Sequence, residues 1–108
     1  MDERQALIAF GAMSQETRLK IVRLLVKAGP DGMAAGIIAE AAGVTASNVS
    51  FHLKELERGG LVTARRDARS IVYSADYQAL SGLIRFLMED CCAGNPAICQ
   101  PALAPACC

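Results

Sequence analysis

All five cysteines of this chain lie within its last eighteen residues. They are Cys91, Cys92, Cys99, Cys107 and Cys108. Cysteines that serve as small buried apolar residues would instead be scattered among the core segments, because free cysteine is among the most buried residue types. Thiolates select soft or borderline ions such as Zn²⁺ and Cu⁺, and by the same reasoning trivalent arsenic and antimony. The cluster therefore indicates metal, metalloid or redox chemistry.

The spacing of the first three cysteines favours a three-coordinate site. Cys91, Cys92 and Cys99 supply three thiols within nine residues, and segment 93–96 can turn the chain back on itself. Trivalent arsenic binds three sulfurs in a pyramid, whereas structural zinc takes four ligands, commonly from paired C-x-x-C elements that this sequence lacks. A zinc, cadmium or copper site and a thiol-oxidation switch remain alternatives. Cys107 and Cys108, which follow a Pro/Ala-rich link, are candidates for extra ligands.

Length and composition point to one small domain, since the chain has 108 residues and 53% of them are hydrophobic. No apolar run approaches the roughly 18 residues that cross a bilayer, and the first residues do not resemble a signal segment. We therefore expect a cytoplasmic protein without a membrane partner, whose thiols stay reduced. The sequence offers no Ser/His/Asp set and no Gly-rich phosphate loop, so we predict no enzyme activity and no organic cofactor.

Two helices are expected in the first quarter of the chain. Asp2 and Gln5 form a capping box that starts a helix over residues 3–12. Ser14 is expected to cap a second helix over residues 14–27, whose broad apolar face predicts a mostly buried element. Arg18 falls inside that face, so its guanidinium should reach a carboxylate or a carbonyl. The opposite face carries Lys20, Arg23 and Lys27.

Residues 34–42 and 45–58 read as two short helices joined by a tight turn at Gly43, the arrangement called helix-turn-helix. In the second helix, an apolar stripe should face the core and leave a polar face that suits base edges and phosphates. Phe51 on that face could contact thymine methyl groups or pack on a loop, and His52 could be structural or could contact DNA. The candidate DNA contacts on this helix are Ser47, Asn48, Ser50, Phe51, His52 and Lys54.

Residues 61–65 and 70–74 are rich in β-branched side chains and flank the segment 66–69, which predicts a small hairpin, or wing. Its arginines, Arg65, Arg66 and Arg69, are candidates for phosphate contacts, although they could also form a solvated hairpin tip. The net charge of the chain is zero, so only such a local cluster could provide a positive footprint.

Asp76 should cap a last helix with an apolar stripe that needs a partner, either the core or, as we favour, the same helix of a second subunit. Cys91 continues this stripe, about three turns after Leu80, so ligand binding could reach the subunit interface. The stripe consists of Leu80, Leu83, Ile84, Leu87 and Met88.

Residues 14–75 resemble the winged-helix repressors of the ArsR/SmtB family. The resemblance rests on SQETRLKIVRLL, VTASNVSFHLKELERGGLV and ARRDARSIVYSA, and the later segment EDCCAGNPAIC resembles the subgroup that senses trivalent arsenicals through cysteines after the last helix. It implies a homodimeric repressor that leaves its operator DNA when the inducer binds. Residues 36–41 lack the cysteines of the family's best-known arsenic site, and His52, the only histidine, cannot supply its zinc sites.

The sequence therefore predicts a mainly α protein with a small β-hairpin, a winged helix-turn-helix over residues 1–92 that dimerises through terminal helices, and a flexible tail over residues 93–108. We expect a transcriptional repressor that binds operator DNA as a dimer and dissociates when trivalent arsenic, antimony or methylarsenite binds. A repressor that responds to zinc, cadmium, copper or thiol oxidation is the alternative. A metallochaperone would use the same cysteines but would need neither a reading helix nor an arginine wing.

Overall fold

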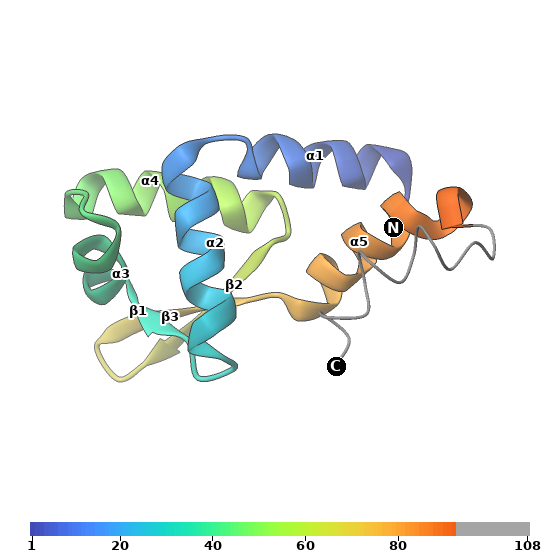
Figure 1. Cartoon of the computed structure of the whole chain (residues 1–108). Helices are drawn as coiled ribbons and strands as arrows, with labels where there is room; N and C mark the ends of the chain where they lie inside the picture. The colour runs from blue at the N-terminus through green and yellow to red at the C-terminus, as the bar shows by residue number, and fades with distance from the viewer. Residues whose placement is uncertain (93–108) are drawn as a thin grey trace.

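Five helices and three short strands follow one another along residues 1–92, whose backbone this computed structural model describes, with side chains described through residue 88. The predicted tail over residues 93–108 lies outside the described residues. The helices and strands appear in the order seen in Figure 1. They are α1 (Glu3–Met13), α2 (Glu16–Ala28), β1 (Met33–Ala34), α3 (Ala35–Ala42), α4 (Ala46–Arg58), β2 (Val62–Asp67), β3 (Ser70–Ala75) and α5 (Tyr77–Cys92).

The helix starts agree with the sequence except at α2. The capping box is present, because the side chain of Asp2 accepts from the backbone of Gln5 at 2.8 Å and the side chain of Gln5 accepts from the backbone of Asp2 at 2.9 Å. The predicted cap at Ser14 is wrong. Its N–H donates to the carbonyl of Gly11 and so ends α1, and the side chain of Gln15 caps α2 instead.

The wing is longer than predicted and belongs to a three-stranded antiparallel sheet in the order β1-β3-β2. Asp67 pairs with Ser70, so only residues 68 and 69 form the turn, and Arg66 extends the strand rather than the tip. Ala68 has a φ of 57°, a left-handed conformation at the first turn position where glycine is favoured. The sequence did not reveal β1, whose residues 33–34 pair with β3; the helix predicted from residue 34 starts at Ala35.

The core lies between α2, α3, α4 and the sheet, with Ile21, Leu25, Ile38, Leu53 and Leu56 fully buried. Figure 1 shows α2 in the middle of the molecule, with α3 on one side, α4 passing behind it, and α1 and α5 toward the other end. The apolar face of α2 is narrower than predicted, because Leu19 and Val26 are 48% and 43% exposed. This mainly helical arrangement with a β-hairpin is the predicted winged helix-turn-helix, and no helix in the described part of the chain is long and apolar enough to span a membrane.

The apolar stripe of α5 serves the core and the surface together. Asp76 caps this helix as predicted, accepting from the backbone of Ala79 at 3.0 Å. Leu83 is buried in the core, while Ile84 and Leu87 are 43% and 50% exposed. The core alone therefore does not explain the stripe.

Gly32 should be the least replaceable glycine in the loop before the sheet. Its φ is +72°, and a Cβ there would collide with the carbonyl oxygen of Tyr73 and approach Oγ of Ser74 to 2.7 Å. Gly29 has a similar φ of +82° but open space around it. We expect Gly29→Ala to lower the free energy of unfolding by about 1 kcal/mol and Gly32→Ala by about 3 kcal/mol or more, measured by urea denaturation. Equal losses would contradict the crowding argument.

Candidate nucleic-acid interface

The outer face of α4 is polar and exposed, as the sequence predicts. Val49, Leu53 and Leu56 turn inward and are at most 1% exposed. Gly43 ends α3 in the left-handed region, with a φ of 73°, and so lets α4 follow after a short turn. The exposed positions opposite the buried stripe include Ser47, Asn48, Ser50, Phe51 and Lys54.

Thr45 fixes the start of this face. Its hydroxyl accepts from the backbone N–H of Asn48 at 3.2 Å and lies 3.4 Å from the hydroxyl of Ser47. The amide side chain of Asn48 has no hydrogen bond within the described residues, so both its donor and its acceptor are available to a ligand. An exposed Asn in the first turn of a reading helix suits bidentate contact with an adenine edge.

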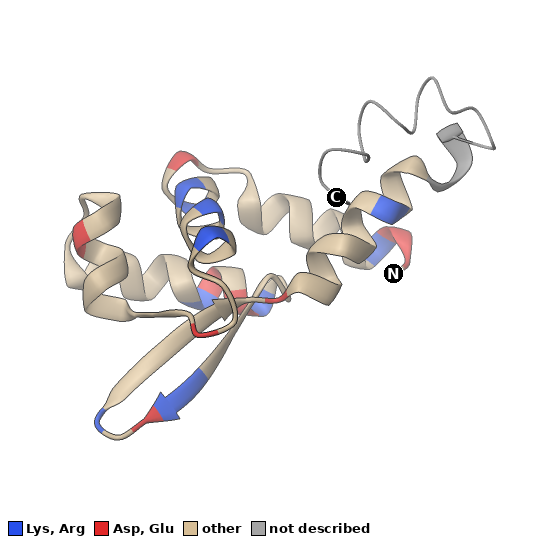
Figure 2. Ribbon diagram, turned by 60° about the horizontal axis from the view of Figure 1, so that its bottom comes forward, with Lys and Arg blue, Asp and Glu red and all other residues tan. Residues whose placement is uncertain are grey.

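The three wing arginines have different surroundings. Arg65 is tied to the loop between α2 and β1, where it donates to the carbonyl oxygens of Asp31 at 2.7 Å and Pro30 at 3.4 Å and to the hydroxyl of Ser74 at 3.3 Å. Arg66 and Arg69 are exposed and form no hydrogen bond within the described part of the chain. Figure 2 shows the positive charges near the end of the hairpin, which projects from the helical body. Arg65 therefore braces the wing, and Arg66 and Arg69 are the better candidates for phosphate contacts.

Arg18 joins α2 to the middle of α4. Its Nε donates to Nδ1 of His52 at 3.1 Å, so the prediction that it reaches a carboxylate or carbonyl is wrong. The same guanidinium lies 5.5 Å from the ring centre of Phe51, and the rings of Phe51 and His52 meet edge to face at 5.7 Å. Burial lowers the pKa of His52 below its ordinary value, and the charge of Arg18 lowers it further. The ring is therefore neutral near pH 7.

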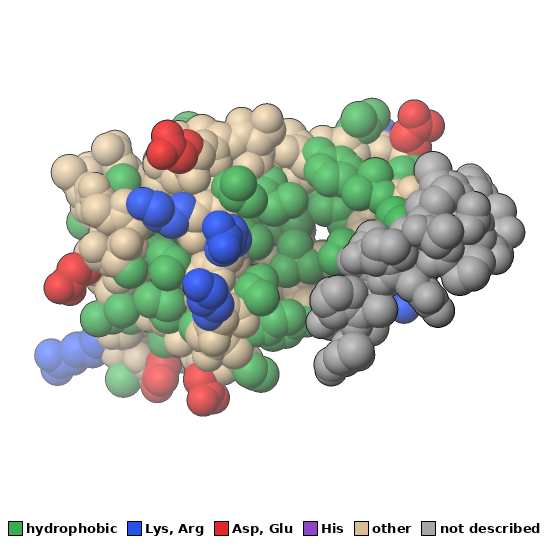
Figure 3. Space-filling model, in the orientation of Figure 1, with side chains coloured by type: hydrophobic (Ala, Val, Ile, Leu, Met, Phe, Trp, Pro, Cys, Tyr) green, Lys and Arg blue, Asp and Glu red, His purple; other side chains and the backbone are tan. Residues whose placement is uncertain are grey.

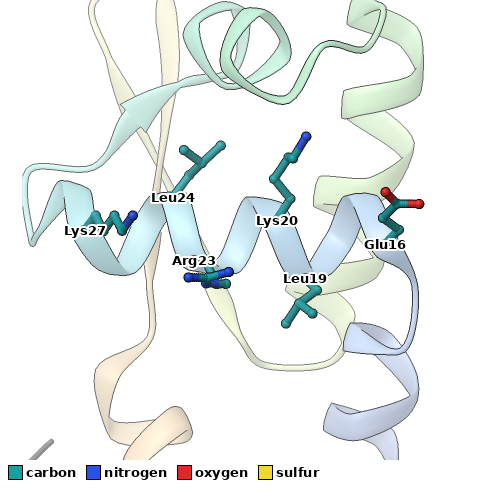
Figure 4. Close-up of a pocket in the computed structure, with 6 residues that line it drawn as sticks. All are labelled: Glu16, Leu19, Lys20, Arg23, Leu24 and Lys27. Carbon is teal, nitrogen blue, oxygen red and sulfur yellow. The ribbon is translucent and has the colours of Figure 1, made fainter. Parts of the chain in front are cut away.

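A second positive surface lies on the outer side of α2. Figure 3 shows Lys and Arg side chains gathered over this helix, and Figure 4 shows Lys20, Arg23 and Lys27 around a shallow depression of about 330 Å³. The sequence predicts this grouping. The buried side of α2 packs against α3, α4 and β3, so these cations lie away from the reading face.

Helices α1 and α5 lie at the same end of the molecule and contact each other (Figure 1), and both carry exposed large apolar side chains. Ile84 and Leu87 come from α5, and α1 adds Leu7 and Ile8, which are 65% and 49% exposed. The apolar stripe predicted to meet a second subunit named residues of α5 alone, and Leu7 and Ile8 of α1 were not assigned to it. The small residues Ala6 and Ala9 form the buried side of α1, so its larger apolar side chains lie outside. This distribution of small and large residues is visible in the sequence.

The predicted thiol site is not tested by the structure. The backbone of Cys91 and Cys92 forms the end of α5, and their side chains, together with Cys99, Cys107 and Cys108, lie outside the described residues. Among the described side chains, no group of three or more His, Cys, Asp or Glu is placed to hold a metal ion.

Comparison with known sequences identifies regulators. Residues 13–65 match a family described as a helix-turn-helix domain. The chain is 35% identical to the HTH-type transcriptional regulator YgaV of Escherichia coli over 82% of this chain and 87% of that protein. It is 37% identical to the nodulation protein NolR of Rhizobium meliloti over 72% of this chain and 62% of that protein. The name of the first relative is that of a transcriptional regulator rather than an enzyme, in agreement with the prediction from the sequence.

Solved structures show the same architecture. An ArsR-like transcriptional regulator from Rhodococcus sp. RHA1 superposes with a TM-score of 0.73 at 28% identity, covering 92% of this chain and 93% of the other. A homodimeric winged helix-turn-helix DNA-binding domain from Mycobacterium bovis superposes with a TM-score of 0.63 at 26% identity, covering 88% of this chain and 82% of the other. A possible transcriptional regulator for arsenical resistance superposes with a TM-score of 0.65 at 29% identity, covering 76% of this chain and 81% of the other.

Proposed function

This chain belongs to the ArsR-like family of winged helix-turn-helix transcriptional regulators, and from that premise we propose that it is a dimeric repressor released from operator DNA by a trivalent metalloid. The proposal that this chain binds DNA rests on the outer face of α4. Its polar side chains are exposed opposite a fully buried stripe, and the wing adds Arg66 and Arg69, which are exposed and form no hydrogen bond with the described residues. Of the predicted DNA contacts, we assign Ser47, Asn48, Ser50, Phe51, Lys54, Arg66 and Arg69, which are exposed, to one duplex and Arg65 to bracing the wing. His52, also predicted, is half-buried beside Phe51.

The dimer is supported by the exposed apolar surface of α1 and α5. Leu7, Ile8, Ile84 and Leu87 would be solvated in a monomer, and one of the similar structures is a homodimer. Two reading helices in a dimer would be spaced for half-sites about 34 Å apart. A dimer also gives the end of α5 a means of acting on DNA, since it can alter that spacing.

The inducer is proposed from the donor set. Three thiols close in sequence suit trivalent arsenic, antimony or methylarsenite, and one similar structure is that of a possible regulator for arsenical resistance. Family membership does not fix the inducer, because a nodulation protein is also among the relatives. Zinc, cadmium, copper and peroxide therefore belong in the same test.

The test is selection of a duplex from a random pool by the purified protein, followed by binding measurements across salt concentrations and with arsenite. We expect one preferred palindromic sequence, a steep salt dependence from phosphate neutralisation, and release by micromolar arsenite. Release by peroxide or zinc alone would replace the proposed inducer. Failure to select any sequence would overturn the DNA-binding function, as expected of a metallochaperone.

Two interface variants should affect the selected duplex differently. Asn48→Ala should weaken binding roughly 5- to 100-fold and relax the preference at one base pair, because Asn48 is placed for a base edge. Arg69→Ala should weaken binding to all sequences similarly and reduce the salt slope by about one unit, because a phosphate contact is lost. Gln78→Ala, at an exposed position on α5, is the control. Loss of specificity in the Arg69 variant but not in the Asn48 variant would reverse these assignments.

A further inference from the structure

We propose that Arg18 is a positioning residue that holds His52 as a neutral Nε2–H donor aimed at bound DNA. The inference deepens the proposed function, because it concerns the same reading helix. It assigns a DNA contact to His52 and gives Arg18, on a different helix, control over that contact.

The hydrogen bond from Arg18 determines the tautomer of the His52 ring. Arg18 is always a donor, so its Nε can bond Nδ1 of His52 only when Nδ1 carries no proton. In a neutral imidazole the proton then resides on Nε2. The lowered pKa of His52, caused by burial and by Arg18, keeps the ring in this neutral form. Farther along α4, the cation of Arg58 is paired with Glu55 at 3.2 Å.

Nε2 of His52 is not enclosed by the described residues. Within the described residues, every buried side-chain nitrogen or oxygen has a hydrogen-bond partner. Nε2 of His52 has no partner among these residues, so it lies at the solvent-exposed edge of a half-buried ring. The ring thus has one nitrogen held from inside by α2 and a proton on the nitrogen that remains open.

Arg18 also contacts the ring of Phe51. Arg18 lies 5.5 Å from the centre of the Phe51 ring, within the range of a cation–π contact. Phe51 is 56% exposed, so this contact orients an aromatic ring that the core does not hold. One guanidinium therefore positions two consecutive side chains of the reading helix. The partner of Nε2–H would be an acceptor atom of duplex DNA, either a phosphate oxygen or a base edge.

The tautomer can be measured directly, because His52 is the only histidine of the chain. In untagged protein labelled with ¹⁵N, the wild-type ring should show the Nε2–H form at pH 7. Arg18→Lys keeps the charge but removes the planar Nε donor, so its ring should show mixed tautomers. Arg18→Gln removes the charge, so the pKa of His52 should rise. A wild-type ring protonated on Nδ1, or an unchanged ring in Arg18→Lys, would overturn the proposal.

The consequence for DNA is tested on the duplex selected by the wild-type protein. Arg18→Lys and His52→Ala should each weaken binding about tenfold, the effect of losing one well-formed hydrogen bond to DNA. In a His52→Ala background, Arg18→Lys should change affinity less than in the wild-type background, because the part of its effect that passes through His52 is already lost and only the contact with Phe51 remains. Arg23→Lys, on the outer side of the same helix, is the matched control and should bind normally.

The alternatives separate cleanly. If Arg18→Lys lowers the melting temperature but the folded variant binds normally, the contact is only structural and the proposal is wrong. Equal losses from Arg18→Lys in both backgrounds would also overturn it. For His52→Ala, a uniform loss across sequences identifies a phosphate partner, and a loss confined to one base pair identifies a base edge; either supports the proposal. If the wild-type protein selects no duplex, the proposed function fails as well, and with it the DNA contact, while the tautomer result stands separately.

Discussion

Replacing Ile84 with glutamate should convert the protein from a dimer to a monomer. The side chain belongs to α5 and is 43% exposed in the single chain. Helix α5 lies beside α1 (Figure 1). A carboxylate buried without a partner in a subunit interface costs about 3–5 kcal/mol, which weakens the dimer by roughly 150- to 5,000-fold. Sedimentation equilibrium measures the change, and affinity for the selected duplex should fall with it because only a dimer contacts both half-sites.

Val26→Glu is the matched control for this experiment. Val26 is also 43% exposed, but it lies on α2, outside the proposed seam. Both variants add the same charge at similarly exposed aliphatic positions, so general effects on folding should be comparable. Leu7→Glu should behave like Ile84→Glu if α1 contributes to the seam. A dimer that tolerates both Ile84→Glu and Leu7→Glu would place the interface elsewhere.

Local signals in the sequence were sufficient to predict most of the fold. The capping box at Asp2, the cap at Asp76 and the buried stripe of α4 each depend on residues within a few positions of one another. The structure confirms all three. The cap at Ser14 was mispredicted because two helix ends compete for the same short link, and Ser14 completes the first of them. The strand β1 was missed because two residues carry no periodicity, and only pairing with β3 defines them.

The sequence predicted which residues form the candidate DNA interface, but not the hydrogen bonds that hold them in place. The exposed face of α4 follows from the periodicity of its apolar stripe. The bond between Arg18 and His52 joins residues 34 positions apart, and the bond from Arg65 to Asp31 is equally distant in sequence. Residue type does not distinguish Arg65 from Arg66, although Arg65 braces the wing and Arg66 forms no hydrogen bond within the described residues. Such roles depend on how the helices and the hairpin pack.

Arsenite should weaken binding of the wild-type protein to its selected duplex by roughly 5- to 150-fold, the usual range of allosteric coupling. Cys91→Ser, Cys92→Ser and Cys99→Ser should each abolish this response, because a pyramidal site loses its third sulfur. Fluorescence anisotropy with labelled duplex measures it. The Cys107→Ser/Cys108→Ser double variant is the control and should respond normally if these residues are only spare ligands.

Methylarsenite provides a second test of the same site, since it needs only two thiols. If Cys91 and Cys92 form the pair, Cys99→Ser should lose its response to arsenite but keep its response to methylarsenite. Normal release in all three single variants would show that the proposed site is wrong. Release by peroxide with no response to either arsenical would indicate thiol oxidation instead.

The backbone of α5 provides a physical reason for coupling between this site and DNA. The helix runs through Cys91 and Cys92, and successive residues of a regular helix are about 100° apart. Coordination of one small atom by both sulfurs therefore favours a change in the last helical turn. Leu87 lies about one turn before Cys91, in the exposed apolar surface, so that change would reach the proposed seam directly. If so, Ile84→Glu monomers should still bind arsenite through their thiols, but arsenite should no longer alter their residual affinity for DNA.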